Sequence, residues 1–156
     1  MNMTHKTLIT SFIALFFMVT GIAQTDESYY ISKTINSTFE EASEKVKLAL
    51  KEQEFGVITE IEMHEKLAEK IVDVDIKPYR ILGVCNPKFA YETIKAEENI
   101  GLFLPCKVLV KYIDENTTEI VMVNPSSLMK MLGNEDLMKV ADEVTVRFKK
   151  AMKTIK

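Results

Sequence analysis

The sequence predicts an α+β fold of two layers, in which helices pack on one face of a mostly antiparallel sheet of about five strands. Two observations support this class. Strand-like and helical segments are mixed along the chain, in the order β-α-β, short α, β-α-β-β-α. The last two strand segments follow one another across a short turn, which predicts an antiparallel hairpin. Together these patterns are typical of a sheet that carries its long helices on one side.

Residues 1–23 have the features of a secretory signal peptide. His5 and Lys6 form a short basic start, residues 8–19 are almost continuously apolar, and Gly21-Ile22-Ala23 offers small residues for cleavage. A transmembrane anchor is the alternative, but the apolar run is shorter than the roughly 20 residues that a spanning helix needs. We therefore expect cleavage near Ala23 and export, to the periplasm or as a secreted protein, with no membrane contact afterwards. Residues 24–28 are then a flexible leader, and residues 29–156 form a single domain.

The charge balance is mildly acidic. The chain carries 20 basic and 23 acidic residues, a net charge of −3. No long block of like charge stands out, so we expect neither nucleic acid nor an anionic membrane as a partner. The two cysteines, Cys85 and Cys106, match no zinc-binding spacing, and His64 is the one histidine beyond the predicted signal peptide. The sequence thus predicts no metal site and no cofactor.

The first predicted elements are a strand and an amphipathic helix. β-Branched and aromatic residues alternate over residues 29–35, as they do in strands. Ser37 and Glu40 fit a capping box at the start of the helix, in which each side chain satisfies the other residue's backbone N–H. Apolar residues then recur at helical spacing to about Glu52. Gly56 is the residue expected to end this helix.

The next segments lead to the centre of the chain. Residues 57–63 alternate as a second strand, and residues 64–72 carry a short apolar face that predicts a short helix. Residues 73–77 are a polar connection, and residues 80–84 form a third strand. Pro87 suits the first position of the helix that follows, because its missing N–H costs nothing there.

That helix is apolar on one face to about Ala96. Residues 102–104 (Leu-Phe-Leu) are expected to be buried, and the hairpin pairs residues 107–113 with residues 119–123. Asn124-Pro125 ends the sheet, and residues 126–131 form a short helical or irregular piece. Asn134 then caps a last helix that runs from Glu135 to about Lys153.

Two motifs in the central stretch resemble those of the DUF302 family, also called TT1751-like. They are Gly83-Val84-Cys85-Asn86-Pro87 and Leu104-Pro105-Cys106, and the similarity extends over about residues 32–152. Asn124-Pro125 resembles an Asp-Pro pair of that family, and Lys107 stands where the family has asparagine. The resemblance implies a β-α-β4-α arrangement of the TATA-box-binding-protein-like class. It implies no reaction, because the family is one of unknown function.

The strand topology decides whether the two cysteines belong to one site. If residues 80–84 and 106–113 are antiparallel neighbours, Cys85 ends one strand where Cys106 begins the next, and the thiols face each other at the same edge of the sheet. In a right-handed parallel crossover they would lie about 15–20 Å apart, at opposite ends of the strands. The antiparallel arrangement predicts a small pocket at the Cys85/Cys106 edge.

Each candidate residue also has a purely structural interpretation. Cys85 precedes a helix N-terminus, which favours a thiolate; the alternatives are a small buried apolar residue or a disulfide with Cys106. Asn86 either binds a ligand or caps the helix. Tyr79 and Arg80 either bind an anion or are a strand-start aromatic and a surface charge. His64 with Glu60 and Glu62 could bind a divalent metal but is interpreted as solvated, and the methionines could bind copper(I) but are interpreted as core residues.

Three functions are compatible with these residues. The first is a non-enzymatic module that binds a small ligand, or another partner, at the Cys85/Cys106 edge. The second is a thiol-based redox or soft-metal protein that uses the same two cysteines. The third is a structural homodimer, since a sheet of this size leaves an edge strand to be covered. The chain contains none of the common hydrolase or nucleotide-binding motifs, so an enzyme is not expected.

Overall fold

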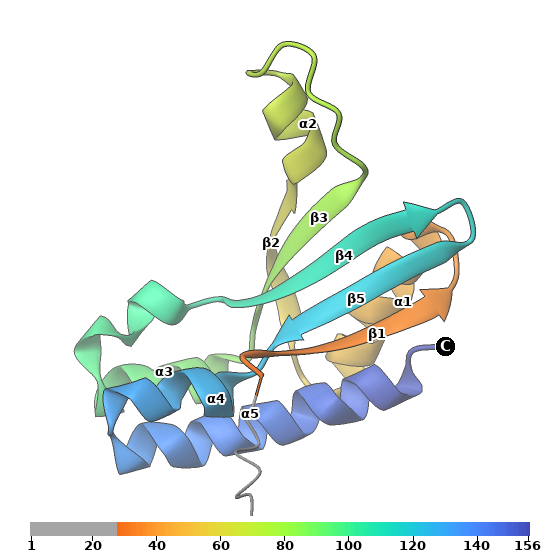
Figure 1. Cartoon of the computed structure of the whole chain (residues 1–156). Helices are drawn as coiled ribbons and strands as arrows, with labels where there is room; N and C mark the ends of the chain where they lie inside the picture. The colour runs from red at the N-terminus through yellow and green to blue at the C-terminus, as the bar shows by residue number, and fades with distance from the viewer. Residues whose placement is uncertain (1–27) are drawn as a thin grey trace, which may run out of the picture.

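The structure, a computed structural model, describes residues 28–156, and the predicted signal peptide lies outside the described residues. Five strands form one antiparallel sheet in the order β1-β5-β4-β3-β2. The strands are β1 Tyr30–Asn36, β2 Gly56–Glu62, β3 Tyr79–Cys85, β4 Cys106–Asp114 and β5 Thr117–Val123. The predicted fold class is confirmed, and so is the hairpin, which is formed by β4 and β5 (Figure 1).

Three longer helices accompany the sheet: α1 Phe39–Glu52, α3 Pro87–Ala96 and α5 Glu135–Thr154. The short elements are α2 Met63–Ala68, α4 Pro125–Met129 and the 3₁₀ turns η1 Glu98–Phe103 and η2 Lys130–Leu132. In Figure 1, α5 runs along the base of the molecule, with α3 and α4 beside its first half. Within residues 28–156 no helix has the length and apolarity to span a bilayer.

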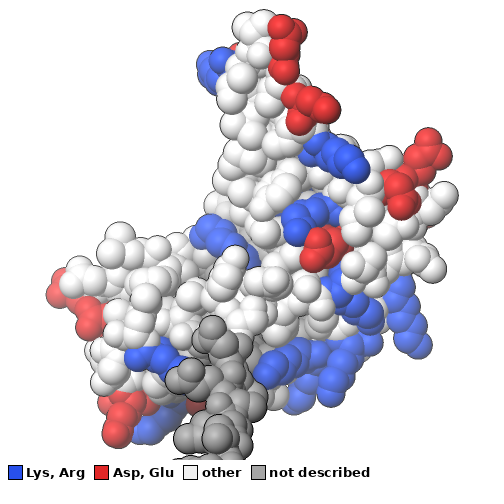
Figure 2. All heavy atoms as spheres, in the orientation of Figure 1, with Lys and Arg blue, Asp and Glu red and all other residues white. Residues whose placement is uncertain are grey.

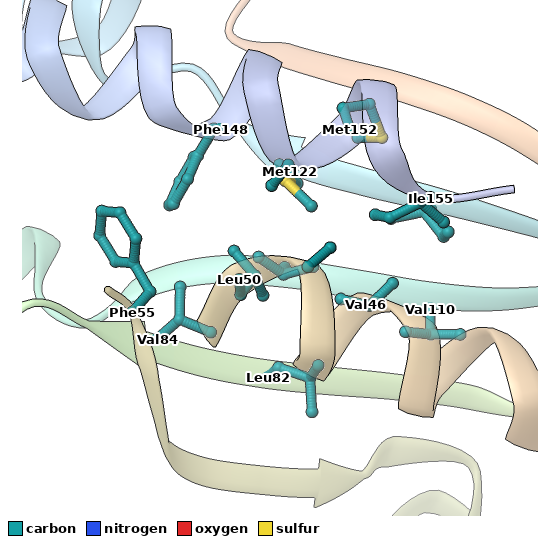
Figure 3. Close-up of a cluster of buried hydrophobic side chains, with 14 of the residues drawn as sticks. Val46, Leu50, Phe55, Leu82, Val84, Val110, Met122, Phe148, Met152 and Ile155 are labelled. Carbon is teal, nitrogen blue, oxygen red and sulfur yellow. The ribbon is translucent and has the colours of Figure 1, made fainter. Parts of the chain in front are cut away.

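The core lies between the sheet and the helices α1 and α5. Leu82, Val84, Val108 and Val110 alternate with outward-facing residues along β3 and β4, so they share one face of the sheet. Against them pack side chains of the two helices, among them Val46, Leu50, Phe148, Met152 and Ile155 (Figure 3). Phe148 and Leu50 are completely buried, and truncating such a side chain costs about 3–5 kcal/mol.

Helix α1 starts with a capping box that is shifted by one residue from the predicted one. Thr38 Oγ1 accepts from the backbone N–H of Glu41, and Thr38 N–H donates to Glu41 Oε2, both at 3.3 Å. The prediction of Ser37 and Glu40 was wrong because Ser37 is still in the connection from β1, where its hydroxyl donates to Glu41 Oε2. Glu40, one residue earlier than the capping glutamate, is left free to bind Arg80.

The end of α1 also differs from the prediction. The residue with a positive φ after this helix is Glu54, at 65°, and Gly56 is the first residue of β2. Backbone bonds from Glu54 N to Lys51 O and from Phe55 N to Leu50 O close the last turn. Phe55 is thereby turned into the core, where it is 3% exposed.

The predicted burial of residues 102–104 was wrong for Leu102 and Phe103, whereas Leu104 is partly buried. Leu102 is 88% exposed and Phe103 is 37% exposed, whereas Ile100 is 2% exposed. These residues lie in the 3₁₀ turn η1, where Ile100 contacts Met129 and Leu137 in a second apolar cluster. A short 3₁₀ turn presents one residue in three to a neighbouring surface, so the consecutive apolar residues do not all point inward.

Candidate functional site

β3 and β4 are antiparallel neighbours, so the structure brings both cysteines to one end of the sheet. In the register of these strands Val84 lies opposite Cys106 and Gly83 lies opposite Lys107. Helix α3 and the turn η1 form the excursion between the two strands. The chain therefore adopts the antiparallel arrangement and not the parallel crossover.

The two thiols lie one register position apart. Cys106 lies on the helix-covered face with its partner Val84, and Cys85 is the next residue along β3. Both cysteines are free, and they lie close enough for Cys85 to raise the pKa of Cys106.

A cavity of about 60 Å³ adjoins this end of the sheet. It lies among the ends of β3 and β4 and the helices α3, α4 and α5, which lie side by side in Figure 1. Phe103 lines it and is partly exposed. The lining residues are Phe55, Val84, Cys85, Asn86, Phe89, Ala90, Thr93, Ile100, Phe103, Leu104, Cys106, Pro125, Met129, Leu137, Val140, Ala141 and Val144.

The walls of the cavity are apolar, and their few polar side chains other than the thiols are engaged elsewhere. Asn86 Oδ1 accepts from the N–H groups of Lys88 and Phe89, and its Nδ2 donates to Glu54 O at 3.1 Å. Thr93 Oγ1 bonds to carbonyl oxygens of α3 itself, 2.9 Å from that of Ala90. Asn86 is thus the N-cap of α3, as one of its two interpretations predicted.

Burial raises the pKa of both thiols. The pKa of Cys85 lies above its ordinary value because burial disfavours the charged thiolate. For Cys106 the shift is larger: burial first, and then the neighbouring Cys85, raise its pKa to about 11. One interpretation of Cys85, from its position before α3, was a thiolate with a lowered pKa, and the shift is in the opposite direction. Both groups are thiols at neutral pH, which makes them weak nucleophiles.

Arg80 is not a surface charge and has no room for an anion. Its guanidinium is 8% exposed and makes two bonds of 3.0 Å to the carboxylate of Glu40. Glu62 and Glu60 contact its Nε, and the group stacks on the ring of Phe39, 4.8 Å from the centroid. Arg80 therefore neutralises a cluster of carboxylates between α1 and the edge of the sheet.

Tyr79 and Arg80 lie at the opposite end of β3 from Cys85. The strand has seven residues, which separates its ends by about 20 Å. The backbone N–H of Tyr79 donates to His64 Nδ1 at 3.2 Å, so this histidine holds α2 against the start of β3. The structure thus unites Cys85, Asn86 and Cys106 at the cavity, and leaves Tyr79 and Arg80 outside it.

The sequence pattern suggested a metal role for His64, Glu60 and Glu62 only as an alternative. Glu60 and Glu62 are bound to Arg80, and His64 Nδ1 lies 3.8 Å from Glu62. Among residues 28–156, no three His, Cys, Asp or Glu side chains are grouped so that they could hold a metal ion. Met122 and Met152 lie in the core, while Met129 lines the cavity.

Sequence reasoning missed the residues that form most of the cavity wall. Leu137, Val140, Ala141 and Val144 come from α5, some 30–60 positions along the chain from the two cysteines. Their apolar spacing predicted a core-facing helix, and that prediction was correct. No local signal separates the part of this face that packs against the sheet from the part that lines a void.

The model of the protein family "Domain of unknown function DUF302" matches residues 31–155 of this chain. Among solved structures, the chain is similar to an uncharacterized conserved protein DUF302 from Bacillus stearothermophilus, with 30% identity and a TM-score of 0.75. The similarity covers 82% of this chain and 98% of the other, so the other chain consists almost entirely of this domain. No curated protein matches the sequence.

Proposed function

This chain belongs to the DUF302 family, and we propose that it binds a small apolar molecule, or the apolar end of a larger one, in the cavity beside Cys106. One observation carries the proposal: the cavity is walled by apolar side chains contributed by both strands and three helices, and it remains open where a core would be filled. Protein interiors leave few voids of this size, because each void forfeits contacts between its walls.

The chemistry of the wall defines the ligand. No charged side chain lines the cavity, and Asn86 and Thr93 are already hydrogen-bonded to the backbone. A charged group would lose its hydration and gain no partner there, which is strongly unfavourable. The ligand group is therefore uncharged and apolar. The thiol of Cys106 is a polarisable contact for it and a weak hydrogen-bond donor.

A homologous series of n-alcohols from butanol to octanol tests the proposal on the domain of residues 28–156. Amide chemical shifts followed by NMR give the affinity and the location of each alcohol. Affinity is expected to rise by about 0.8 kcal/mol for each methylene group that enters the cavity, and then to level off. The largest shifts are expected at Cys106, Val140 and Val144. Shifts scattered over the surface, with no rise along the series, would refute the proposal.

Ala90 provides a blocking variant. It lines the cavity and is half-buried, so Ala90→Leu adds bulk there without replacing a core side chain. The matched control is Ala68→Leu on the exposed surface of α2. Ala90→Leu is expected to weaken alcohol binding at least tenfold, whereas Ala68→Leu is expected to leave it unchanged. Equal binding by the two variants would place the alcohol elsewhere.

A homodimer is the second candidate function, and the uncovered face of the sheet favours it. Ile61, Ile81, Leu109 and Val121 lie opposite one another across four strands, on the face that the core does not use. The ion pair of Lys111 with Glu119, at 2.6 Å, lies on the same face. A second copy offers the same apolar row and both charges, which is the self-complementarity that a two-fold interface requires.

Gel filtration with light scattering tests this assembly at protein concentrations from 10 µM to 1 mM. A dilution of about 100-fold shifts a weak dimer toward the monomer. Leu109→Asp places a charge in the centre of the row and is expected to give a monomer. Leu102→Asp, on the exposed turn η1, is the control and is expected to remain a dimer. A wild-type monomer throughout this range would exclude the homodimer.

The thiol-based alternative has less support. The two cysteines are free, and burial raises the pKa of each. A redox pair or a two-thiolate metal site needs sulfur atoms that meet and that ionise near neutral pH.

A further inference from the structure

The second half of α5 differs in charge from the rest of the molecule. Lys149, Lys150 and Lys153 lie on one exposed face of the helix, at spacings of one, three and four residues, and Lys156 follows at its end. Figure 2 shows Lys and Arg side chains gathered along this part of α5, below the sheet. The net charge of −3, from which we expected no anionic partner, conceals this local excess.

Two neighbouring elements extend the cluster. Lys33 of β1 lines a surface hollow together with Lys149 and Lys153. Ile31 and Met152 line the same hollow. On the other side of the helix end, Lys45 of α1 shares a second hollow with Lys156. We call these six residues the lysine patch: Lys33, Lys45, Lys149, Lys150, Lys153 and Lys156.

The charges of the lysine patch are not consumed by ion pairs. Within the described residues, no salt bridge joins any of the six lysines to a carboxylate, although several other basic residues of the chain are paired. Lys33 donates to the carbonyl oxygens of Met152 and Ile155, and Lys45 donates to Ser37 Oγ, so these hydrogen-bond partners carry no charge. Glu52 is the one acidic residue that lines either hollow.

We propose that the lysine patch binds an anionic lipid surface. Six lysines on one surface reach the number that attracts a protein to acidic lipid headgroups. Two exposed apolar side chains accompany them, Val146 on the same face of α5 and Leu48 on α1. Mixed lysine and aliphatic side chains suit the boundary between headgroups and acyl chains, where the lysine stems also lie along apolar surface.

Nucleic acid is a weaker fit to the same charges. Proteins that recognise nucleic acids commonly use bidentate arginine contacts and aromatic rings on which bases stack. The lysine patch contains no aromatic residue, and the nearby Arg147 is held by Glu54 and Glu143. None of the six lysines lines the cavity, so this inference does not depend on the proposed ligand site.

Vesicle sedimentation tests the inference with residues 28–156, since the solved relative shows that a chain of this domain alone folds. This boundary also removes the apolar residues 8–19, which would bind vesicles by themselves. We expect binding to phosphatidylcholine vesicles that contain phosphatidylglycerol, no binding to pure phosphatidylcholine, and loss of binding at high salt. Equal binding to both vesicles, or to neither, would overturn the proposal.

Charge-matched variants locate the contact. Replacing Lys149, Lys150 and Lys153 with Ala is expected to weaken vesicle partitioning roughly a hundredfold, at about fivefold for each lysine. Replacing Lys66, Lys70 and Lys139 with Ala removes the same charge from other surfaces and is expected to change partitioning less than about twofold. Similar losses in both variants would mean that net charge, and not the patch, determines binding. Tighter binding of a 20-base-pair DNA duplex than of vesicles would overturn the lipid assignment.

Discussion

Cys106 lies opposite Val84, and not opposite Cys85, in the register of β3 and β4. This offset of one residue leaves the two thiols at the same end of the sheet, where both line an apolar cavity with Val84 and Val144. Both cysteines are free, and burial raises the pKa of each, which disfavours the paired-thiolate site that the two motifs had suggested.

The first prediction concerns thiol reactivity. The pKa of Cys106 is raised to about 11, so its thiolate fraction is very small at pH 7 and grows as the pH approaches that value. In the Cys85→Ser variant, Cys106 is expected to react slowly with a disulfide reagent at pH 7, with a rate that rises about tenfold per pH unit to pH 10. Fast reaction of the folded protein at neutral pH would contradict the burial of this thiol.

The second prediction concerns Gly83, the first residue of the first cysteine motif. A Cβ at this position would clash with Thr59 Oγ1 and would lie 2.6 Å from Pro105 Cγ. Gly83→Ala is therefore expected to lower the free energy of unfolding by about 1–3 kcal/mol, measured by urea denaturation. Gly101→Ala is the control, because a Cβ there meets nothing within 4 Å. Equal stability of the two variants would show that β2 and Pro105 do not pack so closely on β3.

The third prediction concerns the buried Arg80. Glu62 already has one buried oxygen that lacks a hydrogen bond. Arg80→Met also removes the cation that is paired with this carboxylate. The expected loss is about 3 kcal/mol in the free energy of unfolding. Arg147→Met, which breaks the more exposed pairs with Glu54 and Glu143, is expected to cost about 1 kcal/mol or less. A reversed order would mean that the Arg80 cluster is solvated.

The fourth prediction is a pH dependence at the start of α1. Hydrogen bonds from the backbone and side chain of Thr38 hold the pKa of Glu41 below its ordinary value of 4.5. A carboxylate with a lowered pKa stabilises the fold above the unfolded pKa, and this contribution disappears as the pH falls through the folded pKa. The stability difference between wild type and Glu41→Gln is thus expected to shrink below pH 4.5. A difference that stays constant down to pH 2.5 would contradict the capping box.

Periodicity predicted the elements of this fold well, because each helix and strand buries one regular face. Asn86, Pro87 and Asn134 marked helix starts correctly, since their side chains and missing N–H act on the adjacent backbone alone. The capping box was displaced by one residue because Ser37 and Thr38 are both suitable N-cap residues. The path of the chain after the end of β1 determines which of them caps the helix. The exposure of Leu102 depends on how η1 meets α5, which no local pattern encodes.

The site was less predictable than the fold. The two motifs correctly located Cys85, Asn86 and Cys106 around one end of the sheet. Arg80 was interpreted as an anion-binding residue or a surface charge because its partners, Glu40 on α1 and Glu62 on β2, are distant in sequence. The lysine patch was missed for a related reason: four of its residues are concentrated near the C-terminus, but Lys33 and Lys45 join them only in the folded chain.

A crystal of residues 28–156 under xenon pressure tests most directly whether the cavity beside Cys106 accepts an apolar ligand. Xenon occupies apolar cavities that water avoids and reports its own position by anomalous scattering. We expect a xenon atom among Val84, Cys106 and Val144, and its loss in Ala90→Leu. Ordered water in this cavity, or no xenon there while other sites are filled, would contradict an apolar binding site beside Cys106.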